Sequence, residues 1–260
     1  MANDVVIYVA DSGSVNGGNY HWVCSRALAQ SSSSPEDLAQ SIASDLASGV
    51  RVVLGYESPL FVPCRQNADK LGKARQGECT RGTGNRPWNA SAGARILATG
   101  IQSLAWVLRR IKELNANTTA TTSWEVFQAE NTDLFLWEAF VSGSEKAVPA
   151  SHVGDAILAI QAFQTHRLAG DMPSASRIQE PDVFSLVGAA ILFAGLSTEV
   201  ELLKLPCVVL RPNIPPDEAE IRITQHKQRL ADRREAKKQA DRARLDAAVQ
   251  AKLEELGHGE

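Results

Sequence analysis

The segment that most constrains the fold is a short apolar run, residues 5–9, which leads into an acid and a glycine-rich turn. Its five residues, VVIYV, are β-branched or aromatic without polar alternation, which is typical of a strand buried on both faces. Asp11 and Gly13 follow, so the predicted strand carries a carboxylate at its carboxyl end, where the chain turns. A second apolar run, residues 20–24, predicts the return strand of a hairpin. Alternatively, Asp11 only caps this turn through its own side chain.

A helix and a second buried strand are predicted next. Ser34 is a suitable N-cap for a helix over residues 34–48, because a proline and two acids follow it. Residues 50–57 are then mostly apolar and end in Glu57. A helical crossover joins parallel strands, so we expect Asp11 and Glu57 to emerge at the same edge of the sheet. Open α/β sheets bind their ligands at that edge.

Further acids lie in the second half of the chain. The apolar run 134–141 predicts a buried strand that carries Glu138. Glu180 and Asp182 are predicted to open an almost wholly apolar helix, and Asp155 lies in the first turn of another predicted helix. Acids at helix starts also have a simple explanation in the helix dipole. The residues therefore leave open whether Glu180 or Asp155 takes the place of Asp182 in a site.

The other sequence features between residues 91 and 168 indicate secondary structure rather than a functional site. Apolar residues recur at helical spacing over 91–114, whereas residues 124–127 have the composition of a strand. His152 and His166 are isolated along the sequence, and we interpret both as structural or surface groups.

The connection over residues 61–89 is long, rich in glycine and locally basic. A connection of this length without secondary structure is usually functional or disordered. If it lies above the two carboxylates, its cations can hold phosphates; elsewhere they form a solvated loop. The candidate nucleic-acid contacts are Arg65, Lys73, Arg75, Arg81 and Arg86.

Composition narrows the function classes. The formal net charge is −3, so any nucleic acid must be held by a local basic patch rather than by a polycationic chain. The four cysteines are widely spaced and form no C-x-x-C pair, which argues against a zinc site and favours reduced thiols in a cytoplasmic protein. We expect no membrane association, because the apolar runs are too short or interrupted to span a bilayer.

The sequence changes character after residue 212. Residues 217–256 contain no glycine, proline or aromatic residue and consist mainly of alanine, leucine and balanced charges. This composition predicts a domain over residues 1–212, followed by a linker and a long charged helix over 213–260. The apolar residues of this tail keep no strict heptad, so it is a solvated helix, a weak coiled coil or an arm for a partner. Of these we favour a protein partner or self-association through the tail.

The order of the motifs resembles an uncharacterised family of predicted nucleases with the RNase H-like fold. The resemblance rests on the Asp11 hairpin, on V-V-L-G-Y-E-S-P-L, on C-R-Q-N-A-D-K-L-G-K-A-R followed by R-G-T-G-N-R, and on L-F-L-W-E-A-F-V-S-G. It covers approximately residues 5–212. The family usually has aspartate where this chain has Glu57, and two adjacent acids where it has Glu180 and Asp182. The resemblance implies an α/β fold with a mixed sheet flanked by helices.

The resemblance also implies metal-dependent hydrolysis of phosphodiester bonds in DNA or RNA. Two divalent ions about 3.5–4 Å apart can activate water and neutralise the leaving oxygen, and oxygen ligands suit Mg²⁺ or Mn²⁺. As in the resembled fold, Asp11 would bridge the ions. The predicted catalytic and metal-binding residues are Asp11, Glu57, Glu138 and Asp182.

Two other classes of function remain open. One is a scaffold with an RNase H-like fold that has lost its chemistry and binds partners. The other is an actin-like phosphotransferase that binds ATP, because the Gly-rich hairpin after Asp11 could cradle a phosphate. Such enzymes build their cleft from two related halves, and no second Asp-x-Gly hairpin occurs in this chain.

Overall fold

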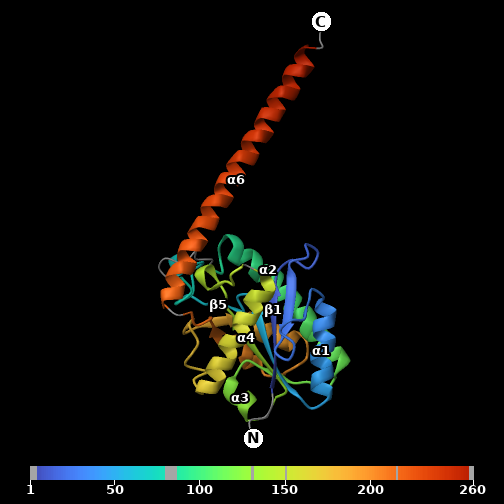
Figure 1. Ribbon diagram of the computed structural model, residues 1–260. Coiled ribbons are helices and arrows are strands. Elements are labelled where there is room, and N and C mark those ends of the chain that lie inside the picture. Colours follow the sequence, from blue (N-terminus) through green and yellow to red (C-terminus); the bar gives the residue numbers. More distant parts are fainter. Residues whose placement is uncertain (1–4, 80–86, 130–131, 150, 215, 258–260) are drawn as a thin grey trace. The chain divides into compact units, whose positions relative to one another are not determined.

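A mixed seven-stranded sheet is the centre of the fold in the computed structural model, which describes residues 5–79, 87–129, 132–149, 151–214 and 216–257 (Figure 1). Its strands are β1 (Val5–Ser12), β2 (Tyr20–Cys24), β3 (Ser31–Ser32), β4 (Arg51–Glu57), β6 (Ala120–Thr121), β7 (Leu134–Ala139) and β9 (Val209–Leu210). The order is β3-β2-β1-β4-β7-β6, and β9 also pairs with β7. The α/β class and the mixed sheet flanked by helices are thus as the sequence predicts.

The register of the sheet brings the strand ends together. β1 and β2 form the predicted antiparallel hairpin, in which Asp11 lies opposite His21. β1 and β4 are parallel, as predicted, and Asp11 lies opposite Glu57. β7 lies parallel to β4 on its other side, and Glu138 is the second-last residue of β7. A Cβ at Gly13 would lie 1.9 Å from the carbonyl oxygen of Asn19, so the turn after Asp11 requires glycine.

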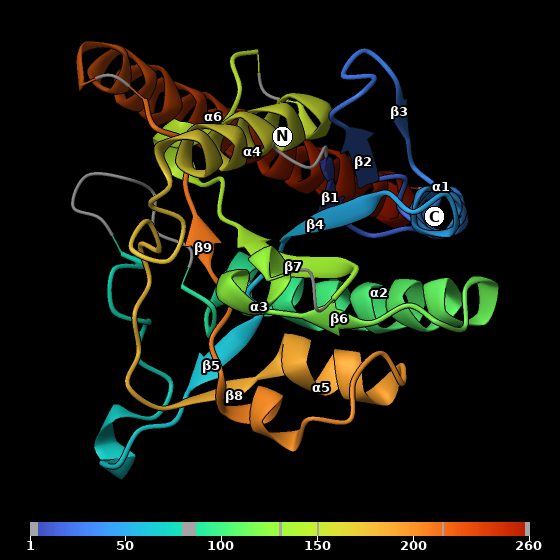
Figure 2. The same cartoon turned by 90° about the horizontal axis from the view of Figure 1, so that it is seen from below.

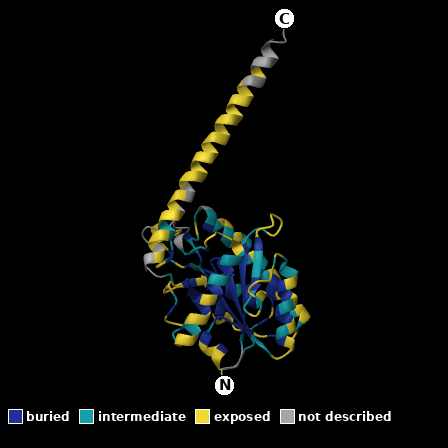
Figure 3. Ribbon diagram, viewed as in Figure 1, coloured by how far each residue is buried: buried dark blue, intermediate teal, exposed yellow. Residues whose placement is uncertain are grey.

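Helices cover both faces of the sheet, as Figure 2 shows for α2 and α4. The strands between them are buried (Figure 3), because apolar side chains point to both faces and pack into two separate cores. The helices α1 (Pro35–Ala47), α2 (Ser91–Leu114) and α5 (Leu186–Phe193) pack in the first core, and α3 (Trp124–Gln128) and α4 (His152–Ala169) pack in the second.

Smaller elements complete this unit. β5 (Phe61–Pro63) and β8 (Val183–Ser185) form a separate two-stranded antiparallel sheet. Short 3₁₀ helices are η1 (Ala68–Lys70), η2 (Gly143–Glu145) and η3 (Val200–Lys204).

The first predicted helix is confirmed together with its cap. The hydroxyl of Ser34 accepts a hydrogen bond from the backbone N–H of Asp37 at 3.1 Å, which satisfies one donor at the open end of α1. Leu38, Ile42 and Leu46 are buried at helical spacing. The sequence therefore determines both the start and the buried face of this helix.

Two predicted elements are wrong. Residues 124–127 form the helix α3 rather than a strand, because Ser123 caps it by accepting a hydrogen bond from the N–H of Val126. Glu180 and Asp182 do not open a helix, since the chain bends at residues 181–182 and then enters β8, which pairs with β5. α5 begins only at Leu186.

The chain divides into two compact units, residues 1–214 and 215–260. The second contains α6 (Pro216–Gly257), a predominantly polar helix whose described side chains are mostly exposed. None of the helices in the described part of the chain combines the length and apolar character needed to cross a bilayer.

Candidate functional site

Three carboxylates converge at the carboxyl edge of the sheet. Asp11, Glu57 and Asp155 each offer an oxygen atom, and these three atoms all lie within 4.8 Å of one another. We call these residues the carboxylate cluster; among the described residues it is the group with the spacing of metal ligands. Their side chains are 9%, 13% and 3% exposed, respectively. Little water reaches these carboxylates, so a bound cation would stabilise their ionised forms.

Different elements hold the three acids in place. Asp11 and Glu57 end the neighbouring parallel strands β1 and β4. Asp155 comes from the first turn of α4, whose N-cap Ser151 accepts a hydrogen bond from the N–H of Gly154 at 2.9 Å. Because α4 is the first α-helix after β7, it begins at the same sheet edge at which the parallel strands end.

Lys146 lies within hydrogen-bonding or ion-pair distance of two acids of the cluster. Its Nζ is 2.5 Å from Oδ2 of Asp155 and 3.4 Å from Oε1 of Glu57. The other oxygen of Asp155 accepts a hydrogen bond from the backbone N–H of Ala147 at 2.7 Å. Burial disfavours the charge on Lys146, but the attraction of Glu57 and Asp155 outweighs burial and raises the pKa of Lys146. The lysine therefore stays protonated at neutral pH.

His152 contacts the third acid. Its Nδ1 lies 2.5 Å from Oδ2 of Asp11, and its ring stacks on His21 with the ring centres 5.5 Å apart. The hydrogen bond to Asp11 raises the pKa of His152 against the opposing effect of partial burial. The imidazole is thus oriented through one nitrogen while 44% of its side chain is exposed.

Glu57 is the acid whose surroundings fit an additional cation best. Burial is the largest cause that raises the pKa of Glu57, and the negative charge of Asp11 adds to it. Its Oε2 is buried and lacks a hydrogen-bond partner among the described residues. An unpaired buried carboxylate oxygen is costly, and coordination of a metal ion would satisfy it. The donor set of three carboxylates suits a hard cation such as Mg²⁺ or Mn²⁺.

A cavity of about 150 Å³ opens beside the cluster. It is lined by Asp11, Glu57, Lys146 and His152 and also by apolar side chains such as Ile96 and Phe140. A substrate group in this cavity would contact Asp11 and Glu57, and it would also contact the side chains of Lys146 and His152.

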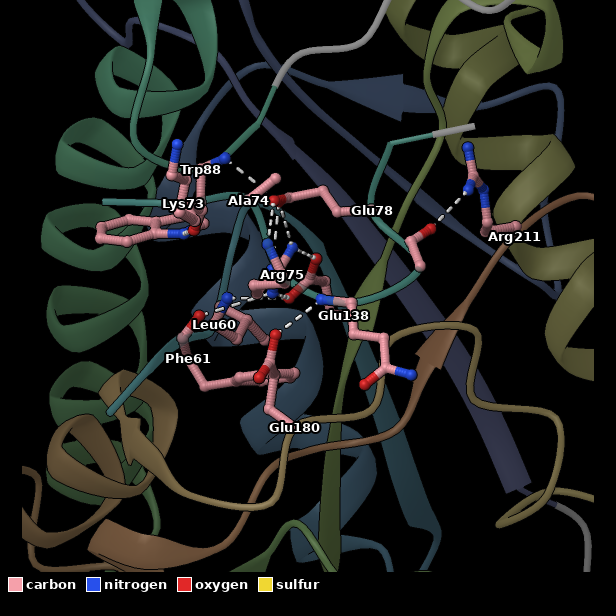
Figure 4. A network of polar contacts seen from close by, with 12 residues as sticks. Leu60, Phe61, Lys73, Ala74, Arg75, Glu78, Trp88, Glu138, Glu180 and Arg211 are labelled. Atoms are coloured by element: carbon pink, nitrogen blue, oxygen red, sulfur yellow. Dashed lines mark hydrogen bonds and ion pairs between the residues drawn. The ribbon is translucent and has the colours of Figure 1, made fainter. Parts of the chain in front are cut away.

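Glu138 lines the same cavity, but a buried arginine binds its carboxylate (Figure 4). Two nitrogens of Arg75 lie 2.7 and 2.6 Å from the two oxygens of Glu138, and the N–H of Leu60 donates to Oε2 at 2.9 Å. Arg75 also pairs with the buried Glu78. Glu138 therefore already has a buried cationic partner. The sequence analysis expected Glu138 in the metal site, but the structure does not group it with the carboxylate cluster.

Asp182 is also separate from the cluster. It is exposed and precedes β8, whose partner is β5 rather than the central sheet. Its neighbour Glu180 is buried and forms a bidentate ion pair with Arg65 at 2.6 and 2.8 Å. Of the two acids that the sequence left as alternatives to Asp182, Asp155 is the one that joins Asp11 and Glu57.

The five predicted nucleic-acid contacts have different surroundings. Arg65 and Arg75 are turned inward to Glu180 and Glu138, so they hold the loop to the rest of the unit. Lys73 is exposed. The other two, Arg81 and Arg86, lie outside the described residues.

Sequence reasoning missed Lys146 and His152 as site residues. A signal was present: a helix that follows a parallel strand begins at the carboxyl edge of the sheet, so its first residues face the same site. His152 and Asp155 are three residues apart and therefore lie on the same side of the first turn of α4. Lys146 lies in the connection that leads there from β7.

The comparisons with known proteins identify no relative: no family model, no curated protein and no solved structure matches the chain. The functional argument thus depends on the residues and their geometry.

Proposed function

We propose that this protein is a metal-dependent nuclease with an RNase H-like fold, which hydrolyses phosphodiester bonds in nucleic acid. The observation that carries the proposal is the convergence of Asp11, Glu57 and Asp155 at one sheet edge. An antiparallel β1–β2–β3 meander followed by parallel strands on the other side of β1 also supports this choice of fold.

The carboxylate cluster would hold Mg²⁺ or Mn²⁺, with Asp11, Glu57 and Asp155 as protein ligands. When bound, a divalent cation neutralises negative charge on a phosphodiester and lowers the pKa of water. The unpaired Oε2 of Glu57 supports this assignment, because the protein supplies no donor for that buried oxygen among its described residues.

The neighbouring side chains would act directly on the substrate. Lys146 lines the cavity and would donate a hydrogen bond to a phosphate oxygen. His152 holds Nδ1 toward Asp11, so its Nε2 is the atom that would exchange a proton with water or with the leaving oxygen. The exposed Lys73 would contact the phosphate backbone.

The test compares Asp11→Asn with Asp182→Asn, which removes an exposed acid outside the cluster. Mn²⁺ binding is measured by calorimetry, and cleavage of single- and double-stranded DNA and RNA is measured with the full chain. Asp11→Asn should strongly weaken both Mn²⁺ binding and cleavage, because it removes a proposed ligand, whereas Asp182→Asn should leave both unchanged.

Other outcomes would reject the proposal. If neither Mg²⁺ nor Mn²⁺ binds to or stabilises the wild-type chain, the fold is better explained as a scaffold without this chemistry. Metal-dependent cleavage that is unaffected by Asp11→Asn would place the active site elsewhere.

A further inference from the structure

Lys146 occupies a position that bears on how many cations the carboxylate cluster can hold. Its Nζ contacts Asp155 and Glu57, at 2.5 and 3.4 Å, so one ammonium group serves two of the three acids. Only 23% of the lysine side chain is exposed. This is a largely buried cation built into the site, rather than a lysine that reaches the cluster through solvent.

The charges around the cluster favour a single additional divalent cation. The three acids carry three negative charges when ionised, and Lys146 cancels one of them. One divalent cation cancels the remaining two, whereas two divalent cations would leave an excess of positive charge. Uncompensated buried charge is strongly unfavourable, so an arrangement that leaves an excess is disfavoured.

The fourth acid at this edge is not available to balance a second ion. Both oxygens of Glu138 are bound to Arg75, and its Oε2 also accepts from Leu60. A second metal ion would need to break this buried ion pair or to displace Lys146 from Asp155. Both changes would expose a charged group that currently has a close partner.

We propose that Lys146 replaces a second metal ion, so that the cluster binds one Mg²⁺ or Mn²⁺ rather than the two that the sequence suggests. This inference rests on the proposed function, because it concerns the same carboxylates. Lys146 would supply the second positive charge beside the substrate phosphate. Oε2 of Glu57, which has no hydrogen-bond partner in the described part of the chain, marks the part of the cluster left for the one ion.

The test counts ions on the full chain with Mn²⁺ alone. Calorimetry gives the number of Mn²⁺ ions bound per chain, and electron paramagnetic resonance shows whether two bound ions are magnetically coupled. The wild-type chain should bind one ion and give an uncoupled spectrum. Lys146→Met should bind two ions that are coupled, because it removes the fixed charge and vacates its position.

Two control variants separate the effect of this charge from a general effect of mutation. Lys146→Arg keeps the positive charge and should still bind one ion. Lys204→Met removes an exposed lysine on η3 and should also bind one ion. The wild-type titration is decisive by itself if Lys146→Met fails to fold.

The outcomes distinguish this inference from the proposed function. Two coupled ions in the wild-type chain would overturn the role of Lys146 but would leave the metal site intact. A single ion in a folded Lys146→Met chain would overturn it as well. Absence of Mn²⁺ binding in the wild-type chain would reject the metal-dependent function and this inference with it.

Discussion

Glu138 and Glu57 both lie at the carboxyl ends of parallel strands, yet their partners differ. Glu138 faces the buried guanidinium of Arg75, which binds both of its oxygens. Glu57 lies beside Asp11 and Asp155, and among the described residues one of its buried oxygens has no hydrogen-bond partner. The same residue type therefore serves the stability of the fold in one strand and forms a candidate ligand in the next.

Removing the charge of Glu138 should destabilise the protein strongly. Among the described residues, Glu138→Gln would leave Arg75 with Glu78 as its charged partner in a dry site. Loss of one partner of a buried ion pair costs about 3–5 kcal/mol. The free energy of unfolding from urea denaturation measures this loss. The control is Glu113→Gln, at an exposed ion pair of α2, which should cost less than about 1 kcal/mol. Equal effects of the two variants would contradict a structural role for Glu138.

Tyr56 should make stability depend on alkaline pH. Burial raises the pKa of Tyr56 from 10.0 to about 12, with hydrogen bonds to Ser103 and Tyr20 opposing the shift. A pKa raised by folding adds stability that is complete below pH 10 and is lost as the pH rises through about 12. The contribution is on the order of 3 kcal/mol.

The comparison of wild type with Tyr56→Phe between pH 9 and pH 12 measures this contribution. The free energy of unfolding should fall less steeply with pH in Tyr56→Phe than in the wild type. The difference in slope should correspond to the release of at most one proton on unfolding. Some dependence should remain, because burial also raises the pKa of Tyr8 and of Tyr20. Identical slopes in the two proteins would show that Tyr56 ionises as easily in the folded chain as in the unfolded chain.

Among the elements, α2 lies directly against the strand ends that carry the site. A Cβ at Gly100 would lie 2.2 Å from Oγ of Ser58 and 3.0 Å from Oγ of Ser12, so only glycine permits this approach. Ser12 and Ser58 directly follow Asp11 and Glu57 in the sequence. The packing of this helix therefore fixes the positions of two acids of the carboxylate cluster.

Gly100→Ala should disturb both stability and metal binding. The added methyl group must push α2 away from β1 and β4, and overpacking of this kind costs about 1–3 kcal/mol. The melting temperature and the affinity for Mn²⁺ should fall together. Gln102→Ala, on the exposed side of the same helix, is the matched control and should change neither. A Gly100→Ala chain with wild-type melting temperature would show that the helix can shift without cost.

Elements with strong local signals could be predicted from the sequence, and those decided by pairing could not. The strands β1, β4 and β7 have apolar runs, α1 has a capping serine, and α2 has apolar residues at helical spacing; all five are confirmed. The segment before α5 was predicted as helix because its acids suit a helix start, but extended pairing with β5 determines its structure. Pairing between distant strands leaves no local signal in either segment.

At the level of the whole molecule, α6 forms a unit separate from residues 1–214. Its exposed apolar residues include Ile221, Leu245 and Val249. A long helix that is polar on nearly all sides gains little from burial by itself. We therefore propose that α6 binds a second copy of the chain.

Truncation after Ile214 tests this proposal. The shortened chain should keep the Mn²⁺ affinity of the full chain, because the carboxylate cluster lies within residues 1–214. The full chain should sediment as a concentration-dependent dimer and the shortened chain as a monomer. The same oligomeric state for both would contradict a role of α6 in association.

The sequence by itself determined the layered α/β fold and the pairing of Asp11 with Glu57. Buried strands, helix caps and a crossover are local patterns, and parallel strands necessarily end at a common edge. Only the tertiary structure decided which other charges belong to the site. Asp155, Lys146 and His152 lie at that edge, whereas Glu138 forms a buried ion pair with Arg75. The reason is that these side chains come from distant parts of the sequence and meet only in the folded protein. A buried charge needs a close partner, so the partner that the fold supplies determines the role of each acid.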